Sequence, residues 1–423
     1  MRDRGELASR DVLRYGAPAV VLALLGIPLF LFVPPHFVDG LGMDAAVVGA
    51  LLLLARVLDL VADPLAGHGC RTAARARIML VCGAALLLAG AWLLFMAAPG
   101  AGVFRLFSGA LLVWLGWTLI AVPVYALGAN LPRHDADRVR LAMGREGCAI
   151  VGTLLAVAVP WAAGLVHDVA ATLALLFLLV AVLLPPALLG FAPLTARAAW
   201  DAPLPWAELR VRSAGLFRDN GFRRTLLAYF LNAAANGAAA ALLVLYVTHV
   251  LAAGDRLGLL LGLYLAAGLC ALPAWLWLAG RAGLVRAWRW SMVWAAAVFV
   301  LVPALSAGDV LAFALVCVAT GLSVGADNAL PSALQARTLS ALRDRTGRDD
   351  AGLAFGWWGL ATKLALAAGA ALGLGVTDLA GFDVREVDDR GRLALSMVYG
   401  LLPVLLKLAA VWSLRGMERR LAG

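Results

Sequence analysis

The stretch ARVLDLVADPLAG, residues 55–67, places Arg56, Asp59 and Asp63 inside a long apolar segment that covers residues 45–67. An apolar segment of about 20 residues is long enough to cross the hydrocarbon core of a membrane as a helix. Spacings of three and four residues bring the three charged groups to one helical face. Each ionised group near the bilayer centre costs about 2.5–3.5 kcal/mol, so such residues usually line an ion or substrate path. The stretch therefore predicts a membrane-spanning helix with a functional charged cluster.

The rest of the chain repeats this apolar pattern. Of its 423 residues, 63% are hydrophobic and 14% are charged, and the mean hydropathy of +0.90 is too high for a soluble protein. Twelve apolar runs of spanning length are found at residues 14–38, 45–67, 78–98, 104–130, 141–166, 171–194, 224–251, 257–280, 287–306, 309–336, 351–377 and 393–414. They predict an all-α polytopic membrane protein with twelve transmembrane helices.

The runs fall into two groups of six, separated by an arginine-rich stretch that contains WDAPLPWAELRVRSAGLFRDN. Two parallel six-helix repeats are typical of the major facilitator fold, in which the substrate binds near the membrane midplane. We therefore expect an N-terminal bundle over residues 1–196, a cytoplasmic central loop over 197–222 and a C-terminal bundle over 223–423.

The arginines orient the predicted helices in the membrane. With both termini and every even-numbered connection on one side, that side receives 27 of the 33 arginines. The positive-inside rule makes that side cytoplasmic, which predicts a multi-pass protein of the plasma (bacterial inner) membrane with both termini inside. The net charge of +9 is then explained by topology and by contact with anionic membrane lipids, and no nucleic-acid partner is expected.

Asp59 and Asp63 predict a site for a coupling ion. Like-charge repulsion and burial favour a proton shared by the two carboxylates or a cation bound between them. Asp59 lies about 21 Å inside its helix, and Thr118 lies at the same depth in the run 104–130, so its hydroxyl is a further candidate ligand. Pro64 leaves the carbonyl of Leu60 without its helical donor. The alternative is a structural cluster, in which Arg56 and the aspartates only hold helices together or latch a gate.

Other polar residues in the spans suggest a substrate site. Lys363 stands about 18 Å inside the run 351–377, where its ammonium needs a carboxylate, an anionic substrate group or water. A structural pair with Asp59 or Asp63 is the alternative. Asn232 and Asn236 share one helical face, and Asp327 interrupts the run 309–336; interhelical hydrogen bonds are an equally common use of such groups. Lys407 lies near the cytoplasmic end of its run and is expected to snorkel, so we leave it out of the site.

With these residues identified, the chain resembles the glycoside-pentoside-hexuronide cation symporters, the melibiose-permease-like branch of the major facilitator superfamily. The resemblance is carried by ARVLDLVADPLAG (55–67), FRRTLLAYFLNAAAN (222–236), GADNALPSALQA (325–336) and GLATKLALAAGA (359–370). It implies that Asp59, Asp63 and Thr118 hold the coupling cation and that Lys363 is the buried lysine of the family's eleventh helix. Tyr125 takes a place where the family often has tryptophan, and Arg145 matches a family arginine near the cytoplasmic end of the cavity.

The chain departs from that family at several positions. Aligned on Tyr15-Gly16 and on LIAVPVYALGANLP (119–132), the two sugar-binding acids of the family are Ala23 and Ala121, which offer a sugar no hydrogen-bond partner. A sodium-binding asparagine of the family is Ala62, and losing a neutral oxygen ligand favours a proton over a bare cation. The loop between the second and third helices is also shorter and lacks the acidic residue of the family's cytoplasmic latch, and Arg71 stands near that place.

These observations predict a secondary active transporter, a cation-coupled symporter that works by alternating access on a small organic solute. The family favours a sugar or glycoside, although the sugar-binding acids are missing, and a lysolipid or other amphiphile is the alternative substrate. A non-transporting receptor or scaffold is the alternative of another class. We find no motif of an enzyme. Besides the coupling ion, proton or sodium, no cofactor is expected, no metal is expected except sodium at Asp59 and Asp63, and a monomer is expected.

Overall fold

The computed structural model describes residues 7–132, 134–165, 168–198, 200, 205, 207–382 and 388–417, and within them every regular element is helical. Between α1 (Ser9–Leu31) and α14 (Asp389–Ser413), twelve further α-helices are present. They are α2 (Val33–Pro35), α3 (Ala45–Gly69), α4 (Ala73–Phe95), α5 (Val103–Asn130), α6 (Asp135–Ala162), α7 (Val169–Thr195), α8 (Glu208–Arg218), α9 (Asn220–Leu245), α10 (Leu257–Ala282), α11 (Leu284–Phe299), α12 (Val310–Thr346) and α13 (Ala351–Leu379).

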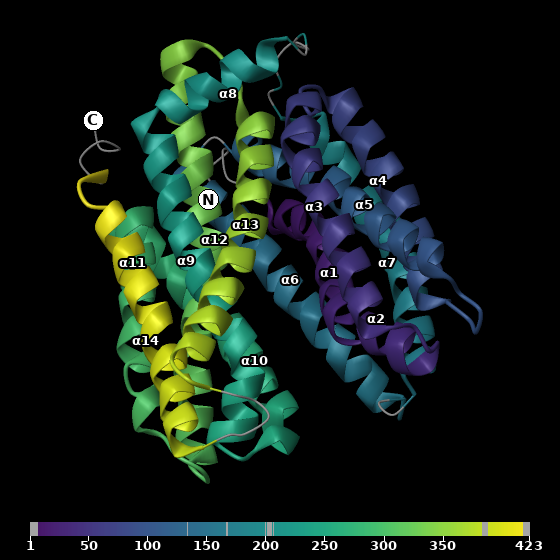
Figure 1. The fold of residues 1–423 in the computed structure, drawn as a ribbon. Helices are drawn as coiled ribbons and strands as arrows, with labels where there is room; N and C mark the ends of the chain where they lie inside the picture. The colour runs from purple at the N-terminus through teal and green to yellow at the C-terminus, as the bar shows by residue number, and fades with distance from the viewer. Residues whose placement is uncertain are drawn as a thin grey trace. The chain divides into compact units, whose positions relative to one another are not determined.

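Six helices of spanning length precede α8 and six follow it (Figure 1). In the described part of the chain, ten of them meet length and hydropathy criteria for crossing a membrane. The other two, α1 and α3, have 23 and 25 residues, which is also enough for a hydrocarbon core of about 30 Å. The helices coincide with the twelve predicted runs, so the predicted all-α, twelve-helix architecture is confirmed. The largest difference is α12, which continues to Thr346, ten residues beyond the predicted run.

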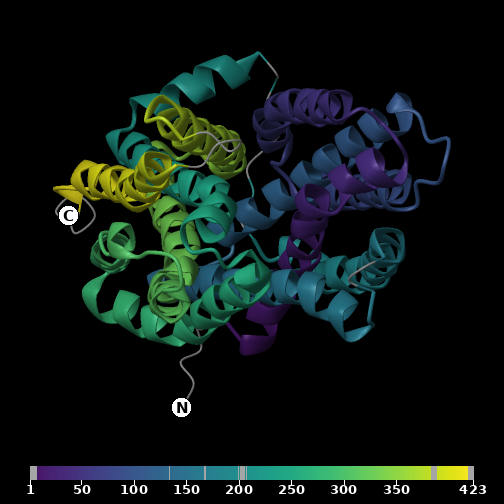
Figure 2. The same cartoon turned by 60° about the horizontal axis from the view of Figure 1, so that its bottom comes forward.

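The chain forms two compact units. The first comprises Met1–Leu216 and Leu339–Leu360, and the second comprises Phe217–Thr338 and Ala361–Gly423. Figure 2 shows the helices of each unit gathered into a bundle. The two long helices α12 and α13 contribute to both units. The predicted central loop, 197–222, contains α8 and the start of α9, while its residues 199, 201–204 and 206 lie outside the described residues.

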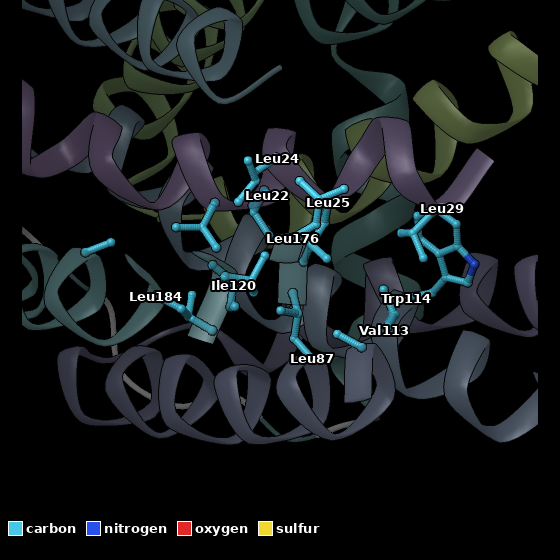
Figure 3. Close-up of a cluster of buried hydrophobic side chains, with 14 of the residues drawn as sticks. Leu22, Leu24, Leu25, Leu29, Leu87, Val113, Trp114, Ile120, Leu176 and Leu184 are labelled. Atoms are coloured by element: carbon cyan, nitrogen blue, oxygen red, sulfur yellow. The ribbon is translucent and has the colours of Figure 1, made fainter. Parts of the chain in front are cut away.

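In the first unit, α1 packs along α6, and α5 packs against both α3 and α4. The core includes leucines, a valine, an isoleucine and a tryptophan from α1, α4, α5 and α7 (Figure 3). Leu24, Leu25, Leu87 and Leu176 have no exposed surface. Because lipid is as apolar as leucine, this packing is held by close van der Waals contact and not by water exclusion.

Glycines bring α4 and α5 into close contact. A Cβ added at Gly90 would lie 2.6 Å from the backbone nitrogen of Val113, and one at Gly116 would lie 2.5 Å from that of Leu87. No side chain fits at such distances, so only glycine permits this approach. Small residues at helix interfaces are the usual way in which membrane helices pack backbone to backbone.

The second unit has an aromatic core near the end of α9. Tyr246 and Tyr399 stack with ring centroids 4.5 Å apart, and Phe313 packs 5.3 Å from the Tyr246 ring. The Tyr246 hydroxyl donates a hydrogen bond of 3.0 Å to the carbonyl of Val302, which satisfies the one polar group of this ring. Helix α14, which carries Tyr399, also packs along α9 and α11.

Side-chain caps define where several helices begin. Each cap oxygen accepts a backbone N–H of the first turn, and the caps are Thr72 of α4, Asp168 of α7, Asp219 of α9 and Asp388 of α14. Such caps satisfy one of the N–H groups that a helix start leaves without a partner. Local sequence therefore determines these starts.

Candidate functional site

The first unit brings Asp59, Asp63 and Thr118 into one buried cluster. The Thr118 hydroxyl lies 2.6 Å from Oδ1 of Asp63 and 3.1 Å from Oδ1 of Asp59. The exposed fractions of the three residues are 3% or less. The aspartates lie one turn apart on α3, and α5 presents the threonine to both of them. Three oxygen atoms therefore converge on one point inside a membrane-spanning bundle.

Arg56 lies at the edge of this cluster. Its Nη1 is 3.8 Å from Oδ2 of Asp59, and its guanidinium lies 4.0 Å from the ring centroid of Trp114. Trp114 and Thr118 are one turn apart on α5, so the same face of α5 holds the arginine and the aspartates. The arginine side chain is 29% exposed, whereas Asp59 is fully buried. The positive charge of Arg56 thus lies at the partly exposed edge of the cluster.

Helix α13 covers Asp63 with backbone. A Cβ added at Gly359 would lie 2.9 Å from Oδ2 of Asp63, and one at Gly356 would lie 2.4 Å from the Asp63 carbonyl oxygen. Further along the same contact, a Cβ at Gly67 would lie 2.3 Å from the carbonyl oxygen of Gly352. Glycines four and three residues apart on α13 let its backbone close directly over the carboxylate, which explains the burial of Asp63.

Tyr125 and Arg145 form a second group in the first unit. The Arg145 guanidinium lies 4.3 Å from the ring centroid of Tyr125, a cation–π geometry, and Tyr125 stacks on Phe355 at 5.4 Å. Arg145 is only 6% exposed and also interacts with the Tyr15 side chain. The two predicted substrate residues are therefore brought together, with Tyr15 and Phe355 as neighbours that the sequence analysis did not single out.

Asn232 lies in the second unit, where it belongs to an ion-pair network. The ammonium of Lys407 donates 2.7 Å to Oδ1 of Asn232 and 2.6 Å to Oδ2 of Asp327. The Ser291 hydroxyl donates 2.7 Å to Oδ1 of Asp327. The expectation that Lys407 snorkels is wrong: its exposed fraction is 3%, because its ammonium is turned toward a carboxylate on the neighbouring helix.

Lys363 is half-buried on the part of α13 that belongs to the second unit. Beside it, the hydroxyls of Thr362 and Tyr229 are hydrogen-bonded at 2.9 Å, which ties α13 to α9. A pairing of Lys363 with Asp59 or Asp63 would join the two units, and it stays a prediction.

Within the first unit, a group of ion pairs and hydrogen bonds ties Arg71 and α8 to the segment between α12 and α13, and the sequence analysis missed it. Arg71 is 3% exposed and donates hydrogen bonds to the carbonyl of Asp349 at 3.0 Å and to Oδ1 of Asp350 at 3.2 Å. Arg212 of α8 approaches the same Asp350 oxygen at 3.4 Å, and Asn130 donates to Asp349 at 2.8 Å. Arg71 stands near the place of an acidic residue in the family. Here the arginine forms the contacts, and its acidic partners lie between α12 and α13.

The missed ion pair has a signal in the sequence. Asp327 lies 17 residues after the start of α12, and Lys407 lies 18 residues after the start of α14. Both helices enter from the same predicted side, so equal depth, the criterion that matched Thr118 to Asp59, also matches Lys407 to Asp327. The pairing was missed because Lys407 lies only about 9 Å from the other end of α14.

Comparison with known proteins agrees with this architecture. A family described as MFS/sugar transport protein matches residues 14–416. A bacterial homologue of the iron transporter ferroportin in the outward-facing state superposes with a TM-score of 0.69 at 16% identity, covering 95% of this chain and 98% of that chain. The E. coli fucose:proton symporter gives 0.65 at 14%, with 95% and 98% covered, and the human organic anion transporter MFSD10 gives 0.64 at 16%, with 94% and 98% covered. At these identities the likeness concerns the fold.

The comparison with curated proteins found no match. The family and the solved structures are those of major facilitator transporters and not of enzymes, as the sequence predicted. Because the family match covers nearly the whole chain, this protein belongs to the MFS/sugar transport protein family, the melibiose-permease-like family of the major facilitator superfamily.

Proposed function

We propose that this transporter is a cation-coupled symporter in which Asp59, Asp63 and Thr118 bind the coupling ion. The single observation that supports this most is the Thr118 hydroxyl, which contacts an oxygen of each buried carboxylate. Two carboxylates that lie one turn apart in a buried site repel each other, so a proton or cation bound between them lowers the cost of burying both.

The coupling ion that we favour is a proton. A threonine hydroxyl has one hydrogen, so it donates to only one carboxylate at a time. If the other carboxylate is protonated, it donates to the Thr118 oxygen, and both short contacts become hydrogen bonds. A sodium ion would use the same three oxygens as ligands, but Ala62 supplies no neutral oxygen as a fourth ligand.

The proposed substrate is a small organic solute. The family description names sugar transport, and a sugar or glycoside is the first class to test. Ala23 and Ala121 lack the carboxylates that would fix several sugar hydroxyls, which favours a solute with fewer polar groups, such as a lysolipid or another amphiphile, as the second class. Arg145 over the face of Tyr125, with Lys363 and Asn232, is the proposed substrate-facing set.

The proposed setting is the bacterial inner membrane, with both termini cytoplasmic and the protein a monomer. The arginine distribution supports this orientation. The Arg71, Arg212 and Asp350 cluster would then lie on the cytoplasmic side, where it would open and close as the transporter alternates between its two states.

The test of the ion site needs no known substrate. We would measure the thermal stability of the purified protein against sodium concentration and pH, because a ligand that binds the native state raises the unfolding temperature. Asp63→Asn should abolish the dependence on the coupling ion. Asp44→Asn is the matched control, since Asp44 is an exposed carboxylate at the start of α3 that caps Val47 and since asparagine caps equally well. If Asp63→Asn responds to sodium and pH as the wild type does, the site assignment is wrong.

The same assay addresses the substrate. A panel of methyl glycosides, glucuronate and lysophosphatidylcholine should contain one class whose stabilisation grows with the coupling ion. If no class stabilises the protein, and if Asp59→Ala and Lys363→Ala leave its cellular function intact, the alternative of a non-transporting receptor or scaffold is favoured instead.

A further inference from the structure

The second unit contains a cavity that the proposed ion site does not use. Its volume is about 150 Å³, and it is lined by α9, α10, α11, α12 and α14. Two of its lining residues, Ala240 and Leu261, are exposed, so the cavity reaches the surface of the unit. Asp327 and Lys407, each 3% exposed, also line it. The cavity therefore leads from the surface to a buried ion pair.

Most of the cavity wall is apolar and aromatic. Tyr264, Phe299, Phe313 and Tyr399 contribute rings. The rings of Phe299 and Phe313 lie 5.7 and 6.3 Å from the ring of Tyr399, so they support one another without a ligand. A cavity of about 150 Å³ with an apolar lining accepts a body of the size of benzene. This part of the cavity selects by size and apolar surface.

Two polar groups facing the cavity have hydrogen-bonding capacity that the described residues do not use. The Lys407 ammonium has three N–H donors, and its described acceptors, Asn232 and Asp327, take two of them. Asn236 lines the cavity, and among the described residues its side-chain amide has no hydrogen-bond partner. An oxygen atom of a bound molecule would accept a hydrogen bond from the Lys407 ammonium or from the side-chain NH2 of Asn236. A hydroxyl group on that molecule would in turn donate to the side-chain oxygen of Asn236.

The charge of the ligand follows from the ion pair. Asp327 and Lys407 are joined at 2.6 Å, so their charges cancel. An anion entering beside them would leave a net negative charge in an apolar environment, and a cation would leave a net positive one, each at a free-energy cost. An uncharged molecule avoids this cost.

From these contacts we infer that the cavity of the second unit is a binding site for a small uncharged molecule with a benzene-sized apolar body and one hydroxyl group, held by Lys407 and Asn236. The site is separate from Asp59, Asp63 and Thr118, which belong to the first unit, and it goes beyond the proposed symport, because neither Asn232 nor Lys363 of the proposed substrate set is among its lining residues.

Three probes with the same ring test this inference: benzyl alcohol, toluene and benzoate. Each would be added to the full-length protein in detergent, and thermal stability and ligand-observed NMR would measure binding. Benzyl alcohol should bind more tightly than toluene, and benzoate should not bind. Asn236→Leu should weaken benzyl alcohol roughly fivefold, the value of one hydrogen bond, and leave toluene unchanged.

A pair of variants on α11 tests the location. Ala295→Leu places extra volume at a buried lining residue and should abolish binding of benzyl alcohol and toluene alike, whereas Ala297→Leu, at an exposed position of the same helix, should not. Asp63→Asn should leave benzyl alcohol binding intact, which separates this inference from the symport proposal. The inference is overturned if none of the probes binds, if benzoate binds as well as benzyl alcohol, or if binding survives Ala295→Leu.

Discussion

Replacing Lys407 by methionine removes the positive half of the buried ion pair while keeping the length of the side chain. The Nζ–Oδ2 distance is 2.6 Å, and neither side chain is more than 4% exposed. Removing one partner of such a pair leaves an uncompensated charge and costs about 3–5 kcal/mol. The entropy of unfolding, about 2.1 cal/mol/K per residue, amounts to about 0.9 kcal/mol/K for 423 residues. The unfolding temperature should therefore fall by about 3–6 °C.

A double-variant cycle separates the lost pair from the lost packing. Asp327→Asn alone leaves the Lys407 ammonium without its carboxylate and should cost a similar amount. The double variant Lys407→Met with Asp327→Asn contains no charge, so it should recover most of the loss, and the coupling energy should exceed about 2 kcal/mol.

The assay is the unfolding temperature of detergent-purified protein, with Arg392→Met as the control. Arg392 forms an exposed pair with Asp389 at 2.9 Å on the same helix, α14, and such pairs contribute little. If Lys407→Met unfolds at the wild-type temperature, or if the effects of the two single variants simply add in the double variant, the ion pair does not contribute the predicted stability.

Three further predictions concern the first unit. In Thr118→Val, the concentration of coupling ion that stabilises the protein should rise at least about tenfold. Thr118→Ser should retain the wild-type response, because it keeps the hydroxyl that contacts both carboxylates. Gly152→Ala should lower the unfolding temperature, because its Cβ would meet the Val20 carbonyl oxygen at 2.0 Å, whereas Gly280→Ala meets nothing within 4 Å and should be neutral or stabilising. Arg71→Ala should speed limited proteolysis between α12 and α13, because the segment there is tied to Arg71.

Each of these three has a contrary result. An unchanged ion response in Thr118→Val would show that the hydroxyl is not a ligand. Equal stability of Gly152→Ala and Gly280→Ala would show that α1 and α6 can separate at no cost. Wild-type proteolysis of Arg71→Ala would assign the order of the segment to Arg212 or Asn130 instead.

The helices were predictable because the bilayer imposes a local rule. A spanning helix satisfies its own backbone hydrogen bonds and needs about 20 apolar residues, so each span can be predicted from its own sequence without knowledge of its neighbours. Residues 309–336 show the limit of this rule. Hydropathy ends the span near residue 336, but α12 continues to Thr346, because the polar residues that follow still favour a helix outside the membrane.

The candidate ion site was predictable to a similar degree. Asp59 and Asp63 are one turn apart on a single helix, and Thr118 follows from a comparison of depth. Lys407 was misread because position along one helix does not say which way a long side chain turns. The carboxylate of Asp327, 80 residues earlier in the chain, decides that direction.

By itself, then, the sequence determined which segments cross the membrane, which side carries the arginines and which residues carry charge into the apolar interior. These properties depend on composition and on spacing within one helix. The tertiary structure alone decided the partners: Gly359 over Asp63, Asp350 beside Arg71, Asp327 with Lys407, and the cavity near Asn236. Such contacts join residues far apart in the chain, and their energies depend on distances of a few ångströms between helices, which no local pattern encodes.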